Sequence, residues 1–270
     1  MRSKLSSVFG VVAAAAFLLT SGGSVNAATV GVTSVGGAWS SLEPLPPGVT
    51  GLNTANVSWG TVHSTSKSGK QSGYSFVGAA AGTIQTDTDF DLGTFTHNNF
   101  VINAGTSIER AGLSIGINLM IGNVSKLVTT AFSFNHWETM NYGESNGLCA
   151  NGGGLKSGVN AAGCADRVTI ADNADQQQSF EIDGFLYILN ITGFTVAGQL
   201  FSEFWTMEDA ANSAILKGRF TLVGPAGPID PVNPVDPVDP PPSPVPLPAA
   251  GWLLLAALGA LGAARARRKA

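Results

Sequence analysis

The hydrophobic residues between positions 28 and 224 fall into short runs in which every second residue is apolar. Clusters of glycine, asparagine, aspartate and serine separate these runs. An alternation of this kind is typical of strands with one buried face, and the intervening residue types are typical of turns. We therefore expect strands at 74–77, 82–87, 89–95, 108–120, 127–134, 167–170, 179–188 and 217–222.

The run at 108–120 is the clearest of these strands. Four aliphatic residues alternate there with small or polar ones, namely Leu113, Ile115, Ile117 and Leu119. Three other segments depart from simple alternation. Gly184 interrupts the pattern within 179–188 and indicates a bulge. Residues 34–70 look irregular, and residues 208–215 have the composition of a short helix.

The order of the predicted elements bounds the fold class. No strand–helix–strand rhythm is present, which disfavours a Rossmann-like or barrel enzyme fold. Several short strands at this spacing indicate an all-β fold, and we expect a single β-sandwich or jelly-roll-like domain over 28–224. About two hundred residues suffice for one domain with its own core.

Residues 1–27 have the features of a signal peptide. Arg2 and Lys4 supply a positive start, residues 8–19 are apolar, and 25–27 form a small-residue cleavage site. Residues 225–244 follow the domain and carry proline at every third position. This spacing matches the three residues per turn of polyproline II, so we expect a semi-rigid spacer.

Residues 245–270 carry three features in a fixed order. The motif Val245-Pro246-Leu247-Pro248-Ala249 comes first, an apolar segment follows at 249–264, and basic residues fill most of 265–269. The apolar segment is shorter than the ~20 residues that usually cross a bilayer core. We expect a short hydrophobic tail helix that anchors the chain transiently in the inner membrane, with its basic end on the cytoplasmic side.

Charge and cysteine content narrow the classes of partner. The segment 28–224 holds eight basic residues against fifteen acidic ones, a formal net charge of −7. This balance disfavours nucleic acid as a partner.

Cys149 and Cys164 are the two cysteines, and in an exported chain we expect a disulfide between them. Neither lies beside a histidine or an acidic cluster in the sequence, which disfavours a metal pair or a catalytic thiol. No cofactor is indicated.

The tail and part of the domain resemble a known family. Residues 245–270 are similar to the VPLPA variant of the PEP-CTERM sorting signal. Phe95-Thr96-His97-Asn98-Asn99-Phe100 resembles the signature of the THxN, or choice-of-anchor K, type of PEP-CTERM protein, and residues 163–169 and 179–184 resemble the same family. The resemblance implies an exported surface module that an exosortase, a membrane processing enzyme, recognises at 245–249. It implies no catalytic activity.

Within the Thr96-His97-Asn98-Asn99 motif, His97 could be a metal ligand or a general base. The other histidines, His63 and His136, show no spacing to it that indicates a site. The flanking residues are of types that form turns. We therefore expect a structural corner after a strand that ends at Phe95, with His97 holding two loops by hydrogen bonds.

Asp87, Asp89 and Asp91 would share one face of an extended chain, because alternate side chains of a strand point the same way. A calcium ion would relieve the repulsion between their carboxylates. The later glycine and glutamate of an EF-hand loop are missing, however. A solvated acidic surface is the favoured interpretation, and a calcium site is the alternative.

Taken together, these features predict an exported, non-enzymatic protein of the cell surface or extracellular matrix. A carbohydrate-binding module associated with exopolysaccharide is the first alternative. Its stacking platform would use four aromatic residues, Trp137, Tyr142, Phe204 and Trp205. A hydrolase built around His97 is a second, less favoured alternative.

Overall fold

The computed structural model describes residues 27–143, 146–171 and 179–227. These residues form strands and one short 3₁₀ turn, Gly158–Asn160, so the described part of the chain is all-β as predicted. The predicted signal peptide, spacer and sorting signal lie almost entirely outside the described residues. Within the described ranges, no helix is both long enough and apolar enough to span a bilayer.

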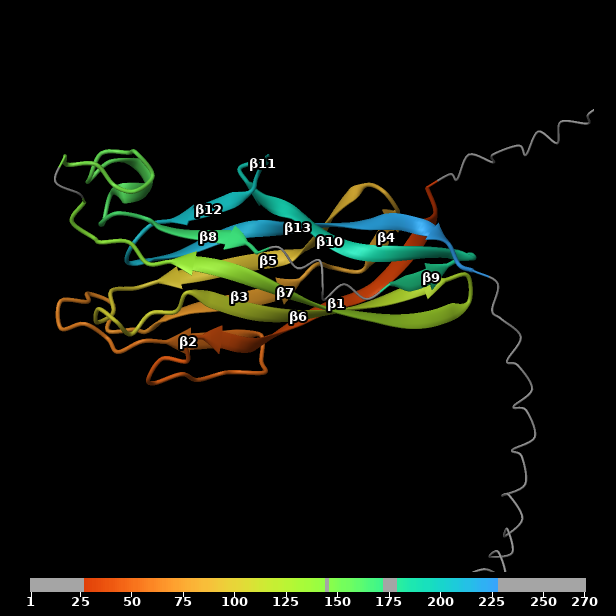
Figure 1. The fold of residues 1–270 in the computed structure, drawn as a ribbon, viewed down its shortest axis with the longest axis horizontal. Coiled ribbons are helices and arrows are strands. Elements are labelled where there is room, and N and C mark those ends of the chain that lie inside the picture. Colours follow the sequence, from red (N-terminus) through yellow and green to blue (C-terminus); the bar gives the residue numbers. More distant parts are fainter. Residues whose placement is uncertain (1–26, 144–145, 172–178, 228–270) are drawn as a thin grey trace, which may run out of the picture. The chain divides into compact units, whose positions relative to one another are not determined.

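The strands form two antiparallel sheets, whose succession along the chain can be followed by colour in Figure 1. The first sheet contains, in spatial order, β12 (Glu203–Thr206), β8 (Asp166–Ile170), β7 (Val124–Trp137), β6 (Arg110–Ile121), β1 (Thr29–Glu43) and β4 (Gly82–Gln85). The second contains β11 (Gln199–Phe201), β10 (Phe185–Val196), β13 (Ala210–Pro225), β5 (Asp89–Asn99), β3 (Ser72–Gly78) and β2 (Asn56–Trp59), while β9 (Phe180–Ile182) pairs with β10.

The buried faces of the two sheets meet in an aromatic core, consistent with the predicted sandwich. Phe95 of the second sheet lies at its centre, with its ring centroid 5.6 Å from that of Trp39 and 5.3 Å from that of Phe134 in the first sheet. The alternation predicted for 108–120 is confirmed, because its four aliphatic residues are all 0% exposed. Burial of this apolar surface is the main force that holds the sheets together.

The short helix predicted at 208–215 is wrong. Those residues enter β13, which lies between β10 and β5 and pairs with both. Every second residue from 214 to 220 is buried, namely Ala214, Leu216, Gly218 and Phe220. The alanine content of the segment favours a helix, but backbone hydrogen bonds to two neighbouring strands override this weak preference.

Two other expectations also need correction. The segment 34–70 is not irregular throughout, because β1 extends to Glu43 and β2 lies within it. Gly184 does not mark a bulge. Together with Asp183 it forms the two-residue turn between β9 and β10, with φ angles of 48° at Asp183 and 79° at Gly184. Positive φ at both positions is typical of the type I′ turns that join antiparallel strands.

Phe95→Ala should lower the free energy of unfolding by about 3–5 kcal/mol, because it removes a fully buried ring and leaves a cavity between the sheets. Val77→Ala is the matched control: it lies on the neighbouring strand β3 but is 67% exposed, so its effect should stay within about 0.5 kcal/mol. Chemical denaturation of both variants measures the difference. Equal losses would contradict the central position of Phe95.

Candidate functional site

The predicted corner at the Thr-His-Asn-Asn motif is wrong, because β5 does not end at Phe95 but continues to Asn99. The strand alternation turns Phe95, His97 and Asn99 into the core, where each is 0% exposed. Thr96 lies on the outer face, and its hydroxyl is hydrogen-bonded to that of Ser213 on β13 at 2.8 Å. The motif therefore places one histidine and one amide inside the sandwich.

His97 joins the two sheets by a hydrogen bond. Its Nδ1 lies 2.8 Å from Oγ1 of Thr206, on β12 of the other sheet. The Thr206 hydroxyl donates to the backbone carbonyl of Asp166 at 3.2 Å, so its oxygen accepts the Nδ1 proton of His97. Burial, with a smaller contribution from nearby His136, lowers the pKa of His97 well below its usual value. The ring is therefore neutral, and its Nε2 carries a lone pair with no partner among the described residues.

His136, which no sequence spacing linked to His97, lies beside it. The two ring centroids are 5.1 Å apart. Nδ1 of His136 is 2.6 Å from the hydroxyl of Tyr74, and its Nε2 is 3.5 Å from Oε2 of Glu138. The sequence carries no signal for this pair, since the two histidines belong to strands of different sheets and meet only when the sheets pack.

Three carboxylates converge next to the histidines. Glu138 follows β7, Asp166 begins β8, and Glu208 lies in the turn between β12 and β13; one oxygen of each lies within 4.8 Å of those of the others. Burial and, to a smaller extent, the charge of Glu138 raise the pKa of Asp166 and raise that of Glu208 to about 8. The nearby side-chain amides of Asn99 and Asn141 lower the pKa of Glu208 in part. Even so, neither Glu208 oxygen forms a hydrogen bond of ordinary geometry within the described residues.

Two overlapping groups of side chains in the described part of the chain could hold a metal ion. One consists of His97, His136 and Asp166, and the other of Glu138, Asp166 and Glu208. Asp166 belongs to both groups, and its Oδ2 has no hydrogen-bond partner in the described residues. All of these residues except Glu138 are at most 5% exposed.

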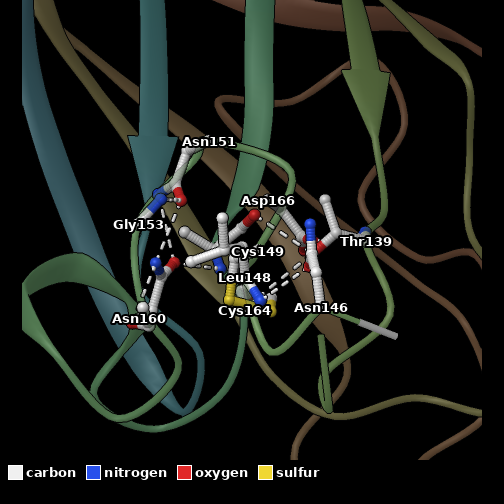
Figure 2. Close-up of a disulfide and its surroundings, with 11 residues drawn as sticks. Thr139, Asn146, Leu148, Cys149, Asn151, Gly153, Asn160, Cys164 and Asp166 are labelled. Atoms are coloured by element: carbon white, nitrogen blue, oxygen red, sulfur yellow. Dashed lines mark hydrogen bonds between the residues drawn. A yellow bond between two sulfur atoms is a disulfide. The ribbon is translucent and has the colours of Figure 1, made fainter. Parts of the chain in front are cut away.

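The loop that ends at Asp166 contains the predicted disulfide, which is confirmed between Cys149 and Cys164. Figure 2 shows Thr139 and Asp166 beside this bridge. The backbone N–H of Thr139 donates to Oδ1 of Asp166 at 2.7 Å, and its hydroxyl donates to the carbonyl of Cys164 at 3.2 Å. The disulfide and these bonds together hold the Asp166 carboxylate in place and leave only Oδ2 free.

The three aspartates considered as calcium ligands have protein partners. Asp89 is paired with Arg219 at 2.9 Å, and Asp91 is paired with Lys217; both basic residues lie on β13. Asp87 lies in a turn with φ of 58°, where its carboxylate accepts a hydrogen bond from a backbone N–H of β13. Asp87 therefore does not share a strand face with the other two. The ion pairs compensate two of the three charges, which favours the acidic-surface interpretation.

The aromatic residues proposed as a stacking platform separate into two sets. Phe204 is 5% exposed and faces the core, whereas Tyr142 is 74% and Trp137 44% exposed. Trp137 and Trp205 have ring centroids 6.4 Å apart. Arg167 lies on the strand between them, with its guanidinium 4.6 Å from the Trp137 centroid and 5.7 Å from that of Trp205. The outer face of the first sheet thus carries a Trp–Arg–Trp ladder.

No protein-family model and no curated protein matches the chain. The resemblance to sorting-signal proteins therefore depends on the quoted motifs alone. What it implies for function is treated below as a proposal.

In buffer that contains a chelator, the melting temperature should fall as pH rises from 6.5 to about 8. The pKa of Glu208 is about 8 in the folded protein and 4.5 without the fold. The folded state therefore binds more protons in this window and is destabilised as they are released. The raised pKa of Asp166 acts in the same direction. The lowered pKa of His97 has the opposite effect, but this effect fades above pH 6.5, because the histidine of the unfolded chain then also loses its proton.

Glu208→Gln should reduce this pH dependence, because the amide does not ionise. Glu181→Gln, on the exposed face of β9, serves as the control and should behave like the wild-type protein. Thermal unfolding followed by circular dichroism measures both. A wild-type melting temperature that is constant or rises between pH 6.5 and 8 would argue against this protonation of the buried cluster.

Proposed function

We propose that the chain is an exported bacterial protein of the THxN type that resides at the cell surface or in the extracellular matrix and has no catalytic activity of its own. The observation that carries the proposal is the order of motif, apolar segment and basic residues within 245–270. The apolar segment partitions into the inner membrane while the basic residues stay on the cytoplasmic side. The motif at 245–249 is thereby presented to an exosortase-like enzyme at the outer face of that membrane.

Features of the domain support this role. The Cys149–Cys164 disulfide is typical of proteins that fold in an oxidising compartment. The chain passes repeatedly between the two sheets, which supports our proposal that the fold is a sandwich of jelly-roll-like type. We assign no catalytic role to His97, because a side chain with 0% exposure offers no surface that a substrate can contact.

Deletion of residues 250–270 should leave the domain exported but release it from the cell envelope, because the truncated chain no longer contains the apolar segment. Fractionation of cells into medium and envelope, followed by immunoblotting, measures its location. Intact mass of the full-length protein from strains with and without an exosortase shows where the chain is cut. If the truncated protein stays with the envelope as the full-length protein does, the sorting role is wrong.

Carbohydrate binding is a second candidate function, and the Trp–Arg–Trp ladder favours it. Trp205 Nε1 donates to Glu203 at 2.8 Å, and Arg167 lies 3.8 Å from the same carboxylate. Aromatic surface and hydrogen-bonding groups thus lie side by side on the outer face of the sheet. This combination suits a sugar of exopolysaccharide, which has apolar faces and hydroxyl edges.

Trp137→Ala and Trp205→Ala should each weaken glycan binding about tenfold or more, because aromatic side chains at the centre of a binding surface carry a large share of its affinity. Val124→Ala is the control, since Val124 lies on β7 with Trp137 and is 68% exposed. A glycan array identifies the ligand, and titration of that ligand gives the affinities. Binding that both tryptophan variants retain in full would exclude the ladder as the site.

A further inference from the structure

The proposed function leaves the buried polar cluster without a role. A buried polar group that lacks a partner costs about 1–3 kcal/mol, and more if it is charged. The cluster nevertheless contains several such atoms, among them His97 Nε2, Asp166 Oδ2 and both oxygens of Glu208. They come from different strands and converge on one region between the sheets. A shared cation would give several of these atoms a partner at once.

We propose that this cluster is a binding site for one divalent zinc ion, held by His97, His136 and Asp166 with a further carboxylate from Glu138 or Glu208. One nitrogen or oxygen of each of the first three residues lies within 4.8 Å of those of the other two. Tetrahedral ligands at about 2.0–2.1 Å from zinc are themselves roughly 3.4 Å apart. Only a small contraction of the cluster is therefore needed to bind the ion. The site is independent of the sorting role.

The hydrogen bonds on the far side of each histidine ring fit this assignment. His97 donates a hydrogen bond from Nδ1 to the Thr206 hydroxyl. Its unprotonated Nε2 therefore faces the cluster. Nδ1 of His136 lies against the Tyr74 hydroxyl, whose oxygen can accept a hydrogen bond from it, and Nε2 points toward the carboxylates. Histidine ligands of zinc are usually oriented by such a bond from the other ring nitrogen.

The donor types indicate the class of metal. Two imidazole nitrogens together with carboxylate oxygens suit zinc and its transition-metal neighbours. Calcium and magnesium prefer a shell of oxygen atoms only. Because four or more protein ligands are available and most are buried, the ion would connect the two sheets and would have no open position for a substrate.

A surface hollow borders the cluster at Glu138. A surface hollow of about 530 Å³ has Glu138, Thr139 and Asn141 in its lining. The Glu138 side chain is 26% exposed and reaches within 3.5 Å of His136 Nε2. Glu138 thus lines the hollow and also reaches the buried histidine, so its carboxylate can offer an ion in the hollow a first ligand.

The test uses the purified full-length chain, stripped with a chelator and then titrated with Zn²⁺ alone. We expect one equivalent to bind by calorimetry and by elemental analysis, and the melting temperature to rise on binding. Co²⁺ in place of Zn²⁺ should give the visible absorption of a tetrahedral site. Ca²⁺ and Mg²⁺ should bind at least about 100-fold more weakly than Zn²⁺.

His97→Ala and Asp166→Asn should each weaken Zn²⁺ binding by about 100-fold or more, since even the loss of an outer hydrogen-bond partner costs 10–100-fold. Asp166→Asn preserves the shape of the side chain and remains informative if His97→Ala does not fold. His63→Ala removes the histidine that is outside the cluster and should leave affinity unchanged. The proposal is overturned if the folded wild-type chain binds no Zn²⁺ with a dissociation constant below about 100 μM. It is equally overturned if Asp166→Asn binds as the wild type does, or if Ca²⁺ binds more tightly.

Discussion

The described domain depends on a polar connection across an otherwise apolar interface. His97 on one sheet donates to Thr206 on the other, and Thr206 donates in turn to the backbone of Asp166. Hydrophobic burial alone is non-directional, so it brings the sheets together without fixing how they slide over one another. A buried chain of hydrogen bonds loses its partners if the sheets shift by one residue. This series of hydrogen bonds therefore fixes how the two sheets are aligned where the aromatic core around Phe95 packs.

The loop between β7 and β8 stabilises the domain and positions carboxylates of the buried cluster. The Cys149–Cys164 bridge constrains the unfolded chain and, in the chain-entropy model, contributes about 3 kcal/mol. It also ends two residues before Asp166, whose carboxylate Thr139 holds in place. Gly163 lies beside Glu208, where a Cβ would approach the glutamate Cγ to 3.0 Å. The same short segment thus stabilises the fold and shapes the surroundings of two carboxylates.

Local patterns predicted the strands well where one face is apolar, as in 108–120. The disulfide was predicted from two cysteines in a chain that we expected to be exported. Local patterns failed where contacts with other strands determine the structure of a segment. Ala214 and the residues around it form the central strand of a sheet because β5 and β10 lie on either side, which a single segment cannot reveal. His97 was placed in a turn because asparagine and threonine favour turns, yet the period of two that begins at Phe95 continues through it. His136 and Glu208 were missed because only the packing of two sheets brings them to His97.

The buried position of His97 raises the question of why the space between the two sheets contains ionisable groups at all. If register were the only requirement, one neutral pair such as His97 and Thr206 would meet it, and apolar residues could replace the three acids at little cost or with a gain in stability. Burial and the charge of Glu138 raise the pKa of Asp166 and of Glu208, so these two carboxylates oppose folding as they ionise. A bound cation would make the ionised carboxylates stabilise the folded state, because each carboxylate that repels its neighbours attracts the ion. The disulfide lies within the loop between β7 and β8 of the first sheet. A bound ion would instead connect the two sheets, at the place where the polar residues converge.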